Sequence, residues 1–115
     1  MTINEIATMV HENAKAKGFH PSEPLEVFIA NQCNNIHGEV QELWDAFRAG
    51  TEEEPCDKNT YISTGEQLTC KEEELADIII RVLDVSKRLG VDIEKAILIK
   101  HQYNTTRPFK HGKKN

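Results

Sequence analysis

The sequence predicts an all-α domain of four main helices arranged as a bundle, on the strength of three observations. Apolar residues recur at steps of three and four along most of the chain, which is the period of an amphipathic helix. Capping residues and glycines bracket these periodic stretches. The 115 residues, 38% of them apolar and 29% charged, are enough for one core but not for two. We therefore treat residues 1–115 as a single domain.

Residues 1–24 are predicted to hold the first helix and a connector. Thr2 and Glu5 have the spacing of a capping box. The apolar steps then continue from residue 3 to about residue 17, and Gly18 supplies a left-handed stop. Residues 19–24 contain two prolines, which predicts a connector rather than a helix.

The second helix is predicted to begin after Pro24, which suits a first helical turn because its missing N–H would be unpaired there anyway. A continuous apolar stripe follows, and Gly50 ends it. At about 100° per residue, Glu39 and Glu42 lie along one flank of that stripe. The two acids therefore border the core, which is an unfavourable position for a carboxylate without a cation.

Residues 51–69 show no sustained period and are predicted to form a long loop. A loop of this length is uncommon in a small domain unless it is a lid, a binding loop or disordered. Tyr61 and Ile62 are its bulky residues, and a short strand or turn around them is compatible with the pattern.

The three cysteines show no paired CxxC spacing. Cys33 lies near the apolar stripe of the second helix, so we expect it to be a small core residue. Cys56 and Cys70 bracket the long loop and are expected to stay reduced in a cytosolic protein. A zinc site that combines them with a histidine is a weaker alternative.

The third helix is predicted to open at Thr69 and Glu72, again with capping-box spacing, and to close at Gly90. The fourth helix starts near Asp92, a good N-cap, and must stop before Pro108 because the residue preceding a proline avoids helical angles. Residues 105–115 are then a polar, basic tail.

Two carboxylate pairs at i, i+3 stand on the flanks of the second and third helices, Glu39 with Glu42 and Glu74 with Asp77. Neighbouring helices that each show two acids one turn apart form a cage of hard oxygen ligands, as Mg²⁺ or Mn²⁺ requires. Arg81 and Asp84 lie further along the third helix, where we expect an ion pair or support for the metal ligands. The alternative is that these acids belong to ordinary solvated helix faces.

The formal net charge of −5 hides an asymmetry along the chain. Residues 37–77 carry twelve acids against three bases, whereas residues 100–115 carry five Lys or Arg and no acid. This distribution is not that of a nucleic-acid binder, but it suits a ligand with bound metal and spare phosphate charge. There is no apolar run long enough to span a membrane and no signal-peptide pattern, so we expect a cytoplasmic protein.

The two acid pairs are followed by Lys100-x-x-x-Asn104-x-x-Arg107. This set, over roughly residues 25–114, resembles the all-α nucleoside triphosphate pyrophosphohydrolases of the MazG-like superfamily. The resemblance implies Mg²⁺-dependent hydrolysis of a (deoxy)nucleoside triphosphate to the monophosphate and pyrophosphate, by a homodimer or homotetramer. The spacing departs from the family because thirty-one residues separate Glu42 from Glu74, and the extra length lies in residues 51–69.

The resemblance also implies roles for individual residues. The metal ligands would be Glu39, Glu42, Glu74 and Asp77, and either Glu42 or Glu39 would orient the attacking water. Lys100 and Arg107 would neutralise phosphate oxygens, and Asn104 would hydrogen-bond phosphate or sugar. A base would be stacked and read by three residues that precede Glu39 on the second helix, Asn35, Asn31 and Phe28. Two rival functions stay open: a phosphoribosyl-ATP pyrophosphohydrolase, and a non-catalytic helical oligomer that binds a metal or a partner protein.

Overall fold

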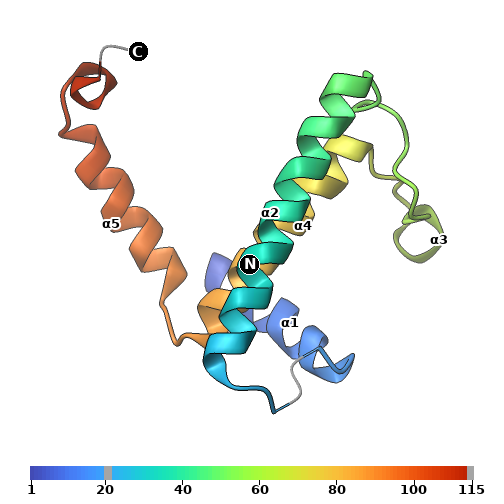
Figure 1. Cartoon of the computed structure of the whole chain (residues 1–115), viewed down its shortest axis with the longest axis horizontal. Coiled ribbons are helices and arrows are strands. Elements are labelled where there is room, and N and C mark those ends of the chain that lie inside the picture. Colours follow the sequence, from blue (N-terminus) through green and yellow to red (C-terminus); the bar gives the residue numbers. More distant parts are fainter. Residues whose placement is uncertain (20–21, 114–115) are drawn as a thin grey trace.

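The computed structural model describes residues 1–19 and 22–113, and over these residues the protein is all-helical (Figure 1). The elements are α1 Ile3–Ala16, α2 Leu25–Ala49, α3 Tyr61–Thr64, α4 Cys70–Arg88, α5 Ile93–Thr105 and a 3₁₀ turn, η1, Phe109–Gly112. In the described part of the chain no helix is long and apolar enough to cross a membrane. The all-α fold class is confirmed.

The helix ends follow from local capping chemistry. The Thr2 side chain accepts a hydrogen bond from the backbone N–H of Glu5 at the start of α1. Thr69 and Glu72 form a full capping box at the start of α4. Gly50 ends α2 in the left-handed conformation with φ 73°, which favours glycine. The predicted boundaries of the four main helices are confirmed to within a residue or two.

Three of the main helices pack together, and the fourth stands apart. The helices α2 and α4 lie side by side, and α1 packs against α4 (Figure 1). The helix α5 is tied chiefly to the start of α1, where Ile3 N–H donates to Glu94 and the Asn4 amide donates to Asp92, at 2.9 and 2.8 Å. The predicted bundle of four helices is therefore not formed within one chain. Polar bonds fix the first turn of α5, but in the described residues most of its large apolar side chains stay exposed.

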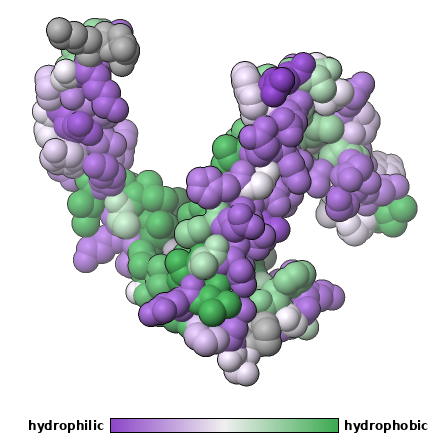
Figure 2. Space-filling view, in the orientation of Figure 1, coloured by the Kyte–Doolittle hydropathy of each residue, from purple (hydrophilic) through white to green (hydrophobic). Residues whose placement is uncertain are grey.

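The core of the single chain is thin. The buried apolar side chains in the described residues are Ala7, Phe28, Cys56 and Leu83. Large apolar side chains stay exposed on both arms of the molecule, Trp44, Phe47, Leu75 and Ile79 on α2 and α4, and Ile97, Leu98, Ile99 and Tyr103 on α5. Figure 2 shows apolar surface gathered around the base of α5. The radius of gyration is 16.7 Å, against about 13 Å for a compact domain of this size.

The loop between α2 and α4 is closed at its base and carries α3 at its tip (Figure 1). Pro55 and Thr69 form an isolated antiparallel bridge, and the Cys56 N–H donates to the carbonyl of Leu68 at 2.9 Å. The turn around Tyr61 that the sequence allowed is helical. Residues 51–69 thus form an ordered loop that is held at its base by backbone hydrogen bonds and projects from the start of α4.

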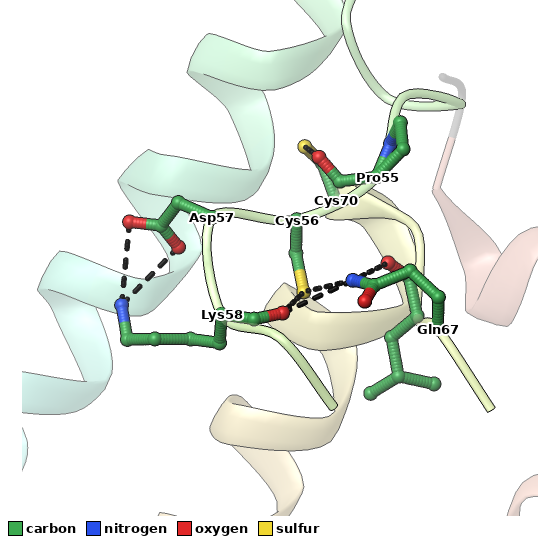
Figure 3. A network of polar contacts seen from close by, with 7 residues as sticks. Pro55, Cys56, Asp57, Lys58, Gln67 and Cys70 are labelled. Carbon is green, nitrogen blue, oxygen red and sulfur yellow. Dashed lines mark hydrogen bonds and ion pairs between the residues drawn. The ribbon is translucent and has the colours of Figure 1, made fainter. Parts of the chain in front are cut away.

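The cysteines are free thiols in the described chain. Cys56 is buried, and its Sγ donates to the carbonyl of Lys58, which also accepts from the Gln67 amide (Figure 3). Cys33 is exposed, so the prediction that it fills the core was wrong. The buried positions of α2 are Phe28 and Gln32, and Cys33 lies beside them on the outer face.

Candidate functional site

The pairing of α2 with α4 brings acids from the two helices together. Carboxylate oxygens of Glu39, Glu74 and Asp77 all lie within 4.8 Å of one another. Each of these side chains is half-buried rather than open to solvent. The i, i+3 spacing of Glu74 and Asp77 puts both on the face of α4 that meets Glu39. The juxtaposition that the sequence predicted for these three acids is confirmed.

The carboxylates disfavour one another's charge. The pKa of Glu74 is raised to about 8, first by burial and then because the carboxylates of Glu42 and Glu39 lie close enough to share a proton with it. The pKa of Asp77 is also raised, by burial and by the negative charge of Glu39. Glu42 therefore faces the cluster as well, although its side chain is exposed and it stands outside the closest set of oxygens. We call these four acids, Glu39, Glu42, Glu74 and Asp77, the carboxylate cluster.

The guanidinium of Arg81 contacts the carboxylate cluster. Arg81 Nε donates to Glu39 Oε1 at 3.2 Å, and the positive charge of Arg81 partly offsets the rise in the pKa of Asp77. Glu39 Oε2 and Glu74 Oε2 are buried and have no hydrogen-bond partner in the described chain. Buried carboxylate oxygens without partners are unfavourable unless a cation or a proton completes them. The donor set is all oxygen, so the residues fit a hard divalent cation such as Mg²⁺ or Mn²⁺.

The residues predicted to bind phosphate lie on α5 and just after it, away from the carboxylate cluster within the same chain (Figure 1). Tyr103 organises them: the Lys100 ammonium lies 4.8 Å from the centre of its ring, and the Arg107 guanidinium lies 5.8 Å from it. Asn104 Oδ1 is buried without a hydrogen-bond partner in the described residues. Lys100 and Arg107 thus meet at one ring and Asn104 lies close to them in sequence, but no contact in the described residues brings the three to the acids.

The residues predicted to read a base are divided. Asn31 and Asn35 are exposed on α2. Phe28 is 0% exposed, and the Arg88 guanidinium lies 4.8 Å from its ring centre. Phe28 is therefore a core residue and does not offer the open stacking face that the sequence suggested.

The sequence predicted that Arg81 and Asp84 form an ion pair or support the metal ligands. The structure places Arg81 against Glu39, one of those predicted ligands, and the buried carboxylate of Asp84 bonds His11 Nδ1 at 2.8 Å. No sequence signal marked His11, because a single histidine on an amphipathic helix carries no pattern. The contact joins α1 to α4 just beyond the carboxylate cluster.

A cavity of about 450 Å³ lies beside the carboxylate cluster, between α1, α2 and α4. Its lining is Met9, Val10, Asn13 and Ala14 of α1, Phe19 after it, Gln32 and Glu39 of α2, and Asp77, Ile80, Arg81 and Asp84 of α4. Gln32 and Glu39 are seven residues apart, which places them on one face of α2 two turns from each other. Gln32 was not among the predicted site residues, and its seven-residue spacing from Glu39 is the signal in the sequence that could have marked it.

No family model, curated protein or solved structure matches this chain. The likeness to the MazG-like superfamily therefore stays a prediction from the motif residues.

Proposed function

We propose that this protein is a Mg²⁺-dependent nucleoside triphosphate pyrophosphohydrolase of the MazG-like type, which cleaves a (deoxy)nucleoside triphosphate to the monophosphate and pyrophosphate. The observation that carries the proposal is the carboxylate cluster, where acids of α2 and α4 meet and two buried oxygens have no hydrogen-bond partner among the described residues. Hydrolysis of the phosphoanhydride bond between the α- and β-phosphates needs positive charge beside the phosphate oxygens, and such a cluster is suited to hold a cation that supplies it.

Within this proposal, the metal ion would be held chiefly by Glu39, Glu74 and Asp77, because their carboxylate oxygens lie closest together. When bound, Mg²⁺ or Mn²⁺ would neutralise the triphosphate and lower the pKa of a nearby water. Glu42 is the better candidate to orient that water, since Glu39 is already engaged by Arg81. The water oxygen would bond to the α-phosphorus, the bond from the α-phosphorus to the bridging oxygen would break, and Glu42 would accept the water proton.

We further propose that the active form is a homodimer or homotetramer. A single chain leaves apolar side chains such as Trp44 and Leu98 at 58% and 63% exposure, which favours their burial against another copy. An α5 from a second chain would supply a helix for the α2–α4 pair. It would also carry Lys100, Asn104 and Arg107 toward the phosphates of a bound substrate.

The test is pyrophosphate release with Mg²⁺ from a panel of common ribo- and deoxyribonucleoside triphosphates and phosphoribosyl-ATP. We expect release from at least one common triphosphate, and a loss of about a hundredfold or more in Glu42→Gln and Asp77→Asn. Glu26→Gln is the matched control, because Glu26 is an exposed acid in the first turn of α2. Helical circular dichroism shows whether each variant is folded.

Two results would replace the proposal by its rivals. Activity on phosphoribosyl-ATP alone would assign the phosphoribosyl-ATP reaction instead. A folded wild-type protein that is inert toward the whole panel would leave a non-catalytic oligomer.

A further inference from the structure

We propose that the cavity between α1, α2 and α4 is a nucleobase subsite, in which the amide of Gln32 pairs with the hydrogen-bonding edge of the base. The assignment of the base to a nucleotide rests on the proposed function. Gln32, on which the subsite depends, nevertheless lies outside the carboxylate cluster, so the two proposals can fail separately.

Gln32 is the observation that points to a ligand. Its side chain lines the cavity and is 9% exposed, and its Oε1 has no hydrogen-bond partner in the described part of the chain. A buried acceptor without a partner is unfavourable, and an apolar residue of similar size would fill the same place without that penalty. A ligand that donates a hydrogen bond to Oε1 removes this free-energy penalty.

The chemistry of an amide selects the kind of ligand. Gln presents an acceptor oxygen beside an NH₂ donor, so it complements a flat group that carries a donor and an acceptor side by side. The Watson–Crick edge of each common nucleobase carries such a pair. The amide can turn to suit either order, so Gln32 recognises a nucleobase as a class rather than one particular base.

The rest of the lining suits the same ligand. Met9, Val10 and Ile80 provide apolar contact for the faces of a ring. Glu39 and Asp77 line the cavity too, which makes it continuous with the carboxylate cluster. Seven residues of helix, or about 10.5 Å, separate Gln32 from Glu39. The cavity thus offers an amide and apolar part for a heterocycle and an acidic part for cation-bound phosphates.

Two charged side chains that line the cavity, Asp84 and Arg81, are already bonded to other residues and do not replace Gln32 as the hydrogen-bonding group for a ligand. Asp84 also lines the cavity, but its carboxylate is bonded to His11 at 2.8 Å. Arg81 is bonded to Glu39. At about 450 Å³ the cavity is in the size range of small-molecule sites.

The experiment is calorimetric titration of the full chain, with Mg²⁺ present, using uridine monophosphate and abasic deoxyribose 5-phosphate as probes. We expect Gln32→Leu to weaken uridine monophosphate binding about tenfold while leaving the abasic probe unchanged. Gln41→Leu is the matched control, because Gln41 is exposed on α2 and bonds Asp45. Its binding of both probes should equal that of the wild type.

A second measurement holds even if Gln32→Leu does not fold. The wild-type chain should bind uridine monophosphate more tightly than its N3-methyl derivative. The methyl group replaces the N3–H, from which Gln32 Oε1 would accept a hydrogen bond. Equal binding of these two probes by the wild type, or equal binding of uridine monophosphate by wild type and Gln32→Leu, would overturn the subsite.

These outcomes are separable from those of the proposed function. If no triphosphate is hydrolysed but monophosphate binding depends on Gln32, the subsite stands and the hydrolase falls. If triphosphates are hydrolysed with a KM that Gln32→Leu does not change, the hydrolase stands and the subsite falls.

Discussion

Arg81 Nε and Glu39 Oε1 lie 3.2 Å apart across the contact between α4 and α2. This ion pair joins the two helices at the carboxylate cluster, where the Glu39 side chain is only 13% exposed. Arg81 supplies the positive charge that a set of nearby acids needs when no metal ion is bound. The pair therefore makes the stability of the helix contact depend on charge.

The first prediction concerns this pair. Arg81→Gln leaves the half-buried Glu39 beside other carboxylates without its cation, so it should lower the free energy of unfolding in EDTA by about 1 kcal/mol. Urea denaturation at pH 7.5 measures the change. Arg48→Gln, at an exposed position in the last turn of α2, should change stability little. Equal effects of the two variants would contradict a specific role for Arg81.

The second prediction follows from the raised pKa of Glu74. Because that pKa is about 8 in the folded chain and near 4.5 when unfolded, the folded state binds the extra proton between these values. Stability in EDTA should therefore be highest at and below about pH 4.5, as far as this group is concerned, and fall as the pH rises to about 8. Thermal unfolding from pH 5 to 8.5 tests this slope. The slope should be smaller in Glu74→Gln, which has no proton to lose there, and an unchanged slope would refute the assignment.

The third prediction concerns α5. If another copy covers its apolar residues, wild type should run as a dimer or tetramer, and Leu98→Glu should shift it to a monomer with reduced pyrophosphohydrolase activity. Light scattering coupled to gel filtration measures the mass. Gln102→Glu adds the same charge at an exposed polar position of α5 and should keep the oligomer. A monomeric wild type would contradict the assembly.

The fourth prediction concerns the contact of α1 with α4. His11→Ala removes a hydrogen bond from the buried carboxylate of Asp84 and should lower the free energy of unfolding by about 1–3 kcal/mol. His37→Ala is the comparison, since His37 is exposed on α2, and it should change stability little. Chemical denaturation of both variants decides the point, and a His11→Ala protein as stable as wild type would show that the contact is unimportant.

The sequence was informative where structure is local. Thr2, Gly50 and the Thr69–Glu72 capping box act within one helical turn, so the helix ends could be predicted without knowing the fold. The carboxylate cluster was also predictable, because helical period puts each pair on one face and adjacent helices tend to pack together.

The sequence did not predict the burial of side chains and helices that pack against distant parts of the chain. The apolar residues of α5 predict a buried helix, but they do not say whether the burying surface is in the same chain. Phe28 and Cys33 both lie near the apolar stripe of α2, but Phe28 is buried and Cys33 is exposed. The difference depends on which face of α2 other elements cover, and α4 is the helix that packs against it. Gln32 and His11 are single polar residues whose meaning depends on what faces them.

The most direct measurement of the central claim is calorimetric titration of Mn²⁺ into the metal-free protein at pH 7.5. We expect saturable binding to the wild type that is lost in Asp77→Asn and in Glu74→Gln, while Glu26→Gln binds as the wild type does. Absence of binding to a folded wild-type protein, or unchanged binding in both cluster variants, would contradict the claim that these acids of α2 and α4 form a cation site.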